Sequence, residues 1–153
     1  MNETTTPETR LSADQTVRTA PKPRYLVHTA RILMGIAFFV FGLNGFLQFM
    51  PPPKTPMPEG AVAFSGALMK TGYMFPLIMG TQLLVGVLLL LNRFVPLALV
   101  LIMPVLVNII AFHIVLQPAG IAPGAILMVL ELFLAWAYRN AYRPLLTPRA
   151  TPD

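Results

Sequence analysis

Six polar side chains interrupt the long apolar stretches of this sequence, and their types could bind a ligand or move a proton. They are one acid, one imidazole and four amides: Glu131, His113, Asn108, Gln82, Asn44 and Gln48. Together these groups offer hydrogen-bond donors and acceptors, and the first two can also exchange protons. The apolar stretches are long enough to cross a membrane, where lipid offers such groups no partner. We therefore expect the six residues to face other helices and take them as the candidate ligand-binding set, with no catalytic residue assigned.

Glu131 is the most informative of the six, because an acid at the centre of a membrane helix costs about 2.5–3.5 kcal/mol on insertion scales. We expect it to face the interior of the fold, either protonated or hydrogen-bonded. Counted at about 1.5 Å per helical residue, Glu131, Gln82 and Asn108 reach a similar depth near the membrane midplane. Two roles stay open. Glu131 could relay protons or contact the polar head of a ligand, or it could form a hydrogen bond to Asn108 or Gln82, worth roughly 0.6–2 kcal/mol.

His113 has a similar pair of alternatives at a shallower level, near Asn44 and Gln48. It could bind a ligand carbonyl or shuttle a proton near neutral pH. It could instead cap the polar cluster of Asn44 and Gln48. Asn108 and His113 are separated by about 140° on an ideal helix, so they would share one small site only if Pro104 distorts that helix.

Four apolar segments predict the fold. They cover about 26–49, 73–91, 94–116 and 121–138. At about 1.5 Å per residue each is long enough to cross most or all of a hydrocarbon core of about 30 Å. Short connections make such helices antiparallel neighbours. The sequence therefore predicts an all-α integral membrane protein, a four-helix bundle with both termini on one side.

Two further patterns refine this prediction. Residues 61–71, AVAFSGALMKT, are too short and too mixed to span, so we expect a short interfacial or re-entrant helix between the first two spans. Gly35 and Gly42 lie two turns apart in the first span, with Gly45 nearby, and small residues so spaced allow another helix to approach closely. This spacing predicts a helix-packing face.

Composition excludes several classes of function. The chain is 56% hydrophobic and 11% charged, whereas soluble domains carry about 25% charged residues. It has no cysteine, which excludes disulfides, thiol catalysis and iron–sulfur ligation. Two histidines and no clustered carboxylates predict no metal site, and no cofactor motif is evident.

The net charge of +5 is placed as membrane topology requires, at the ends of the apolar runs, and not as on a nucleic-acid-binding face. With four spans, one side would hold nine of the eleven basic residues, all except Lys54 and Lys70. The positive-inside rule therefore places both termini in the cytoplasm and the protein in the cell (inner) membrane.

These elements divide the chain into three parts. Residues 1–24 are polar and rich in Thr and Pro, which predicts a disordered cytoplasmic tail. Residues 25–139 form the membrane domain, in which Arg31 is expected to snorkel back to the headgroups. Residues 140–153 form a basic, loosely ordered cytoplasmic tail.

The order of the motifs resembles the DoxX family of small prokaryotic four-helix membrane proteins. The segments that carry the resemblance are RILMGIAFFVFGLNGFLQF (31–49), FSGALMKTGYMFPLIMGTQLLVGVLLLLNRFVPLAL (64–99), VNIIAFHIVLQPAG (107–120) and LELFLAWAYRNAYRPLL (130–146). Arg31 matches the family pattern. Gly45 and Gln82 depart from it, because they stand where many members have Lys and Glu. The resemblance, with this departure, favours a branch of the family whose site is uncharged.

The family name implies a link to the membrane subunits of thiosulfate:quinone oxidoreductase. The first hypothesis is therefore an accessory or anchor subunit, not an enzyme by itself, that holds quinone for a soluble oxidoreductase partner. Glu131, Asn108 and His113 would then bind the quinone oxygens and deliver protons. The alternative is a non-enzymatic protein that binds an apolar small molecule or lipid in the same cavity, alone or self-associated. A proton-coupled transporter is less favoured, because four spans without an internal repeat are few for alternating access.

Overall fold

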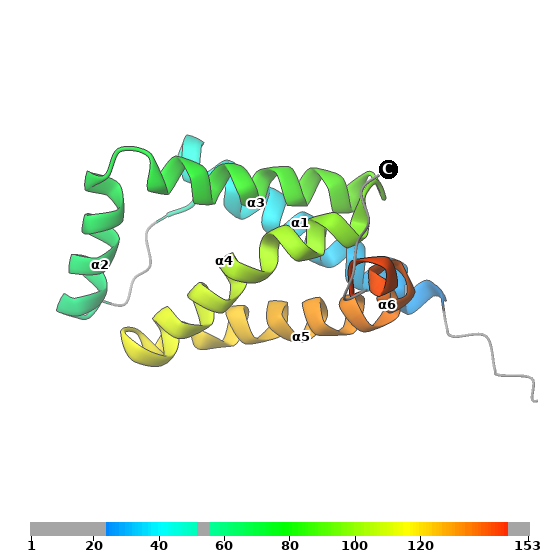
Figure 1. The fold of residues 1–153 in the computed structure, drawn as a ribbon. Helices are drawn as coiled ribbons and strands as arrows, with labels where there is room; N and C mark the ends of the chain where they lie inside the picture. Colours follow the sequence, from blue (N-terminus) through cyan, green and yellow to red (C-terminus); the bar gives the residue numbers. More distant parts are fainter. Residues whose placement is uncertain (1–23, 52–55, 147–153) are drawn as a thin grey trace, which may run out of the picture.

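The computed structural model describes residues 24–51 and 56–146, and every regular element in these ranges is a helix (Figure 1). The five longer helices are α1 (Arg24–Leu47), α2 (Glu59–Lys70), α3 (Met74–Leu90), α4 (Val95–Val115) and α5 (Ile121–Ala137). The short turns are η2 (Pro118–Gly120), α6 (Arg139–Tyr142) and η3 (Arg143–Leu146). The all-α fold class is thus confirmed for the described residues. The predicted N-terminal tail up to residue 23 and the C-terminal residues from 147 onward lie outside them.

The helices have the length and composition that a membrane requires. Three of them could cross it: α1, α4 and α5 with its preceding η2 turn. The shorter α3 passes the same test when it is taken together with α2, from which it is bent by 90°. Apolar side chains are exposed along the outward faces, for example Val129 at 66% and Leu77 at 60%. Such faces are suited to lipid contact.

Helices α1, α3, α4 and α5 pack in a closed cycle, each against the next, with α1 also contacting α5. In Figure 1, α3 and α5 run along opposite sides, α4 crosses obliquely between them, and α2 stands across one end. We call that end the α2 end and the opposite one, where α6 lies, the α6 end. The first and last described helical turns both lie at the α6 end (Figure 1).

The turns between helices follow from local backbone chemistry. Gly72, with φ of 74°, separates α2 from α3, a conformation that glycine adopts without steric cost. The hydroxyl of Thr71 accepts a 3.0 Å hydrogen bond from the backbone N–H of Met74 and so caps the start of α3. Asn92 and Phe94 also have positive φ, which reverses the chain tightly between α3 and α4. Helix α2 occupies the region in which the sequence predicts a short helix.

The first and third helices are in backbone contact. A Cβ on Gly42 would lie 2.5 Å from the backbone nitrogen of Leu83, and one on Gly86 would lie 2.4 Å from that of Phe39. Gly45 likewise lies against the side chain of Met79. The glycine packing face predicted on the first span is confirmed, and Gly86 supplies its counterpart on α3.

Arg31 is 6% exposed and lies among the helices. Its guanidinium donates to the backbone carbonyl of Leu89 and, at 3.5 Å, to that of Leu90. These carbonyls lie in the last turn of α3, at the negative end of its dipole. The carbonyl of Leu89 also accepts the backbone N–H of Asn92 at 3.2 Å, and Arg31 uses its second lone pair. Arg31 therefore caps the end of the neighbouring helix, a contact that the sequence did not predict.

The region beyond α5 also differs from expectation. Residues 140–146, predicted to be part of a loosely ordered tail, lie in α6, which begins at Arg139, and in η3. The hydroxyl of Tyr142 donates to the backbone carbonyl of Pro96 on α4 at 3.4 Å. This contact attaches α6 to the start of α4.

The α1–α3 contact predicts a strong contrast between two glycines of α3. Gly86→Ala should lower the free energy of unfolding by about 1–3 kcal/mol, because its methyl group would overlap backbone atoms of Phe39. Gly80→Ala is the matched control, since a Cβ there meets nothing within 4 Å. It should be neutral or stabilising by up to about 1 kcal/mol. Thermal unfolding of the purified protein in detergent measures both, and equal midpoints for the two variants would contradict the contact.

Candidate functional site

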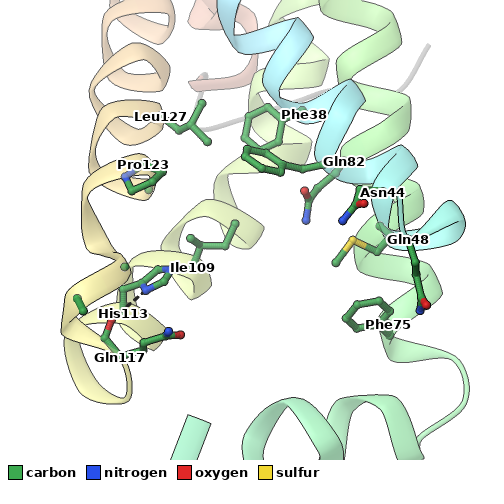
Figure 2. Close-up of a pocket in the computed structure, with 16 residues that line it drawn as sticks. Phe38, Asn44, Gln48, Phe75, Gln82, Ile109, His113, Gln117, Pro123 and Leu127 are labelled. Atoms are coloured by element: carbon green, nitrogen blue, oxygen red, sulfur yellow. Dashed lines mark hydrogen bonds between the residues drawn. The ribbon is translucent and has the colours of Figure 1, made fainter. Parts of the chain in front are cut away.

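A large cavity lies between two walls, α1 with α3 and α4 with α5, at the α2 end (Figure 2). Its volume is about 660 Å³, within the usual range of small-molecule sites. Phe38 and Leu127 lie at its end farthest from α2, and Phe75 and Pro123 line its sides (Figure 2). We call this space the first lobe of the outer cavity.

A second lobe of about 570 Å³ adjoins the first beneath α2. Phe64, Ser65 and Leu68 of α2 line it, opposite residues of α3 and α4. The two lobes share Phe75, Met79, Gln82, Ile109 and His113. They therefore form one outer cavity whose centre is bordered by Gln82 and His113.

Asn44 and Gln48 lie where α1 ends, on the wall of the first lobe (Figure 2). The side-chain oxygen of Asn44 accepts a 2.7 Å hydrogen bond from the backbone N–H of Met50. Because that oxygen is engaged, the amide NH₂ of Asn44 remains available as a donor to the cavity. Gln48 has a φ of 49° and ends the helix, with its backbone N–H bonded to the carbonyl of Asn44 at 2.8 Å.

Gln82 projects from α3 into the same lobe, on the side of Asn44 (Figure 2). It is only 5% exposed, yet its amide makes no hydrogen bond to the described part of the chain. The amide of Gln82 is therefore free to hydrogen-bond to a molecule in the lobe. A ligand that offers an oxygen or a hydroxyl here could pair with it.

His113 faces Gln82 and Asn44 from the opposite wall (Figure 2). Its Nδ1 lies 3.1 Å from the backbone carbonyl of Gln117. A carbonyl can only accept, so Nδ1 carries a proton, and in the neutral form of the ring Nε2 is the acceptor. Gly120 leaves room for the ring, since a Cβ there would lie 2.5 Å from Cε1 of His113.

Asn108 lines the second lobe and not the first. His113 borders the same lobe although the two residues lie on different sides of α4. The second lobe reaches both sides of α4. Asn108 and His113 therefore both line it, although they point in different directions from the helix. Five of the six candidate residues thus line the outer cavity: Asn44, Gln48, Gln82, Asn108 and His113.

Glu131 is the exception. It is 1% exposed and lines a separate cavity of about 340 Å³ toward the α6 end, which we call the inner cavity. It makes no hydrogen bond to Asn108 or Gln82, and its Oε2 is buried without a partner in the described residues. Counting residues placed it at the depth of the two amides, but its side chain points toward the first half of α4 instead, where Leu99, Val100 and Met103 lie.

Tyr142 of α6 lies on the wall of the same inner cavity. Burial raises the pKa of its phenol above the ordinary value of 10.0, with further contributions from the negative charge of Glu131 and from Tyr138. The spacing from Glu131 to Tyr142 places them near one helical face, which is the signal that could have linked them.

The sequence also missed Gln117, whose backbone carbonyl fixes the proton of His113, and the aromatic rings of Phe38 and Phe75 in the cavity wall. Gln117 lies one helical turn after His113, so the spacing could have indicated the contact. In the described ranges, no three His, Asp or Glu side chains are grouped in a way that could hold a metal ion.

Comparison of the chain with protein-family models, with curated proteins and with solved structures finds no match in any of the three. The site must therefore be interpreted from its own geometry. That geometry defines a helical protein with apolar membrane-length helices, an uncharged outer cavity and an acidic inner one.

The inner cavity predicts a shift in the titration of Tyr142. In Glu131→Gln, the pKa of Tyr142 should fall toward 10.0 because the negative charge that raises it is removed. It should remain above that value, since burial is the larger cause. Tyrosinate absorbance against pH measures this, and subtraction of a Tyr142→Phe titration isolates the residue among the four tyrosines. An unchanged pKa in Glu131→Gln would contradict the proximity of the two groups.

Proposed function

We propose that the protein is a DoxX-like four-helix membrane bundle that binds a quinone in its outer cavity and serves as the membrane subunit of a quinone-linked oxidoreductase or detoxification complex. Both termini would lie in the cytoplasm, which the placement of Lys and Arg supports. In this proposal α1, α3, α4 and α5 are the four spans, and α2 lies at the outer surface beside the cavity.

The observation that carries the proposal is the polarity of the first lobe. On one wall, Asn44 offers an N–H donor and Gln82 a complete amide. On the other, His113 offers the acceptor Nε2. Apolar side chains close the far end of the lobe, among them Phe38 and Leu127 (Figure 2). A planar ring with an oxygen at each end is complementary to such a site.

The assignment of the imidazole proton gives each wall a role. The amides of Asn44 and Gln82 would donate to a carbonyl oxygen of the ligand. Nε2 of His113 would accept from a ligand hydroxyl, so it could take up or return a proton as a quinol is oxidised or a quinone reduced. The quinone supplies the two-electron chemistry when bound, and the partner supplies or accepts the electrons. Glu131 has no place in this site, because it lines the inner cavity.

The second candidate is a protein that binds an apolar small molecule or lipid without a reaction. The second lobe favours it, because it is lined by apolar residues of α2, α3 and α4 and its polar groups are uncharged. Gly45 and Gln82, which stand where the family often has a charged pair, both line the first lobe. An uncharged cavity suits a neutral apolar ligand in either proposal.

Binding of a reduced short-chain analogue, decylubiquinol, tests the site, because its hydroxyls can donate to Nε2 of His113 and accept from the amides. Gln82→Leu and His113→Phe should each weaken binding about 3- to 10-fold, the value of one hydrogen bond. Thr81→Val is the matched control, because Thr81 precedes Gln82 on α3, bonds the carbonyl of Leu77 and lines neither lobe. It should bind as the parent does. Equal affinity of all four proteins, or no saturable binding by the parent, would remove the quinone site.

Isolation from native membranes in mild detergent, followed by mass spectrometry of bound proteins and small molecules, tests the rest of the proposal. A stoichiometric oxidoreductase together with quinone is the expected result. Recovery of the protein with an apolar molecule but without a redox partner would favour the second candidate. That outcome would overturn the accessory-subunit role while leaving the cavity as a binding site.

A further inference from the structure

The inner cavity is separate from the site described above. It lies between α4, α5 and α6 and is lined by Leu99, Val100, Met103, Pro104, Glu131, Ala135 and Tyr142. With the outer cavity it shares only Pro104. It is shallow and largely open, with Val100 50% exposed at its edge, and its volume of about 340 Å³ is at the small end of ligand-binding sites.

Its polar groups are all oxygens. Glu131 is 1% exposed and its Oε2 has no hydrogen-bond partner among the described residues. Pro104 has no N–H, so it cannot donate to the carbonyl of Val100, one turn earlier on the same wall. The hydroxyl of Tyr142 donates to Pro96, which leaves its oxygen as an acceptor. No basic side chain is among the lining residues.

Such a cavity is complementary to a positive charge. A buried carboxylate is costly unless it is paired, and membrane acids normally have a partner. Arg31, the buried cation of α1, is engaged with the carbonyls of Leu89 and Leu90 and forms no ion pair with Glu131. The partner of Glu131 must therefore come from outside the described chain, as a proton or as a cationic ligand.

We propose that the inner cavity binds a small organic cation, with its charged group paired to the Glu131 carboxylate and its apolar body against Leu99, Met103 and Ala135. The apolar walls exclude a hydrated inorganic ion, because they offer it few ligands. The ring of Tyr142 lies on the same wall, and an aromatic face also attracts organic cations. The cation and a proton compete for the same carboxyl group.

Equilibrium binding of radiolabelled tetraphenylphosphonium to the full-length protein in nonionic detergent tests the proposal. The parent should bind it saturably at one site, and Glu131→Gln, which keeps the side-chain shape, should bind it at least about 10-fold more weakly. Glu59→Gln is the matched control, because it removes an exposed carboxylate of α2 that lines neither cavity. Absence of saturable binding to the parent, or equal affinity in Glu131→Gln, would overturn the proposal.

A second measurement does not depend on how well the variant folds. Dicyclohexylcarbodiimide adds to carboxyl groups in apolar surroundings and leaves an N-acylurea that mass spectrometry can locate. In the parent protein it should modify Glu131, and saturating tetraphenylphosphonium should lower that labelling several-fold. Labelling of Glu131 that the cation does not change would show that the carboxyl holds a proton only, and would overturn the proposal. Neither result depends on quinone binding in the outer cavity.

Discussion

The backbone contact of α1 with α3 is the constraint on which the rest of the structure depends. In lipid, apolar surface gives helices no reason to associate, so contact must come from close packing and from polar interactions. Gly42 and Gly86 supply the first, because each leaves space for the backbone of the other helix. Arg31 supplies the second, through the carbonyls of Leu89 and Leu90. Together these contacts join α1 and α3 into one wall, at the glycine contact and again near the end of α3.

That wall was largely predictable, whereas the direction of individual side chains was not. Apolar runs and glycine spacing identify helices and a packing face, because both are properties of one segment. Depth also follows from counting residues. The direction in which Glu131 points depends on how α5 is rotated against α4, which is a property of the packed structure. For the same reason, residue counting grouped Glu131 with Asn108, although the two line different cavities. The hydrogen-bond partners of Arg31 could not be predicted from its own segment either, because they belong to another helix.

The two cavities divide the polar groups by charge. The outer cavity has amides and a neutral imidazole, and the inner one has a carboxyl and a phenol. An uncharged site can exchange a neutral ligand without a large desolvation cost. A buried carboxylate without a partner is costly, so ligand binding in the inner cavity should depend more strongly on the charge of the ligand. Pro104, on α4, borders both cavities and weakens the helix between them.

The polarity of the outer cavity is set by the backbone at the helix ends and not by a ligand. The carbonyl of Gln117, just beyond α4, holds the imidazole proton on Nδ1 of His113. The N–H of Met50, just beyond α1, holds the oxygen of Asn44. The carbonyl of Gln117 also accepts the backbone N–H of Gly120 at 3.1 Å, and its second lone pair is available to His113. One wall therefore presents a donor and the other an acceptor before anything binds. A ligand with only carbonyl oxygens could pair with the donor wall alone, whereas a ring with a hydroxyl at one end and a second oxygen at the other could pair with both walls.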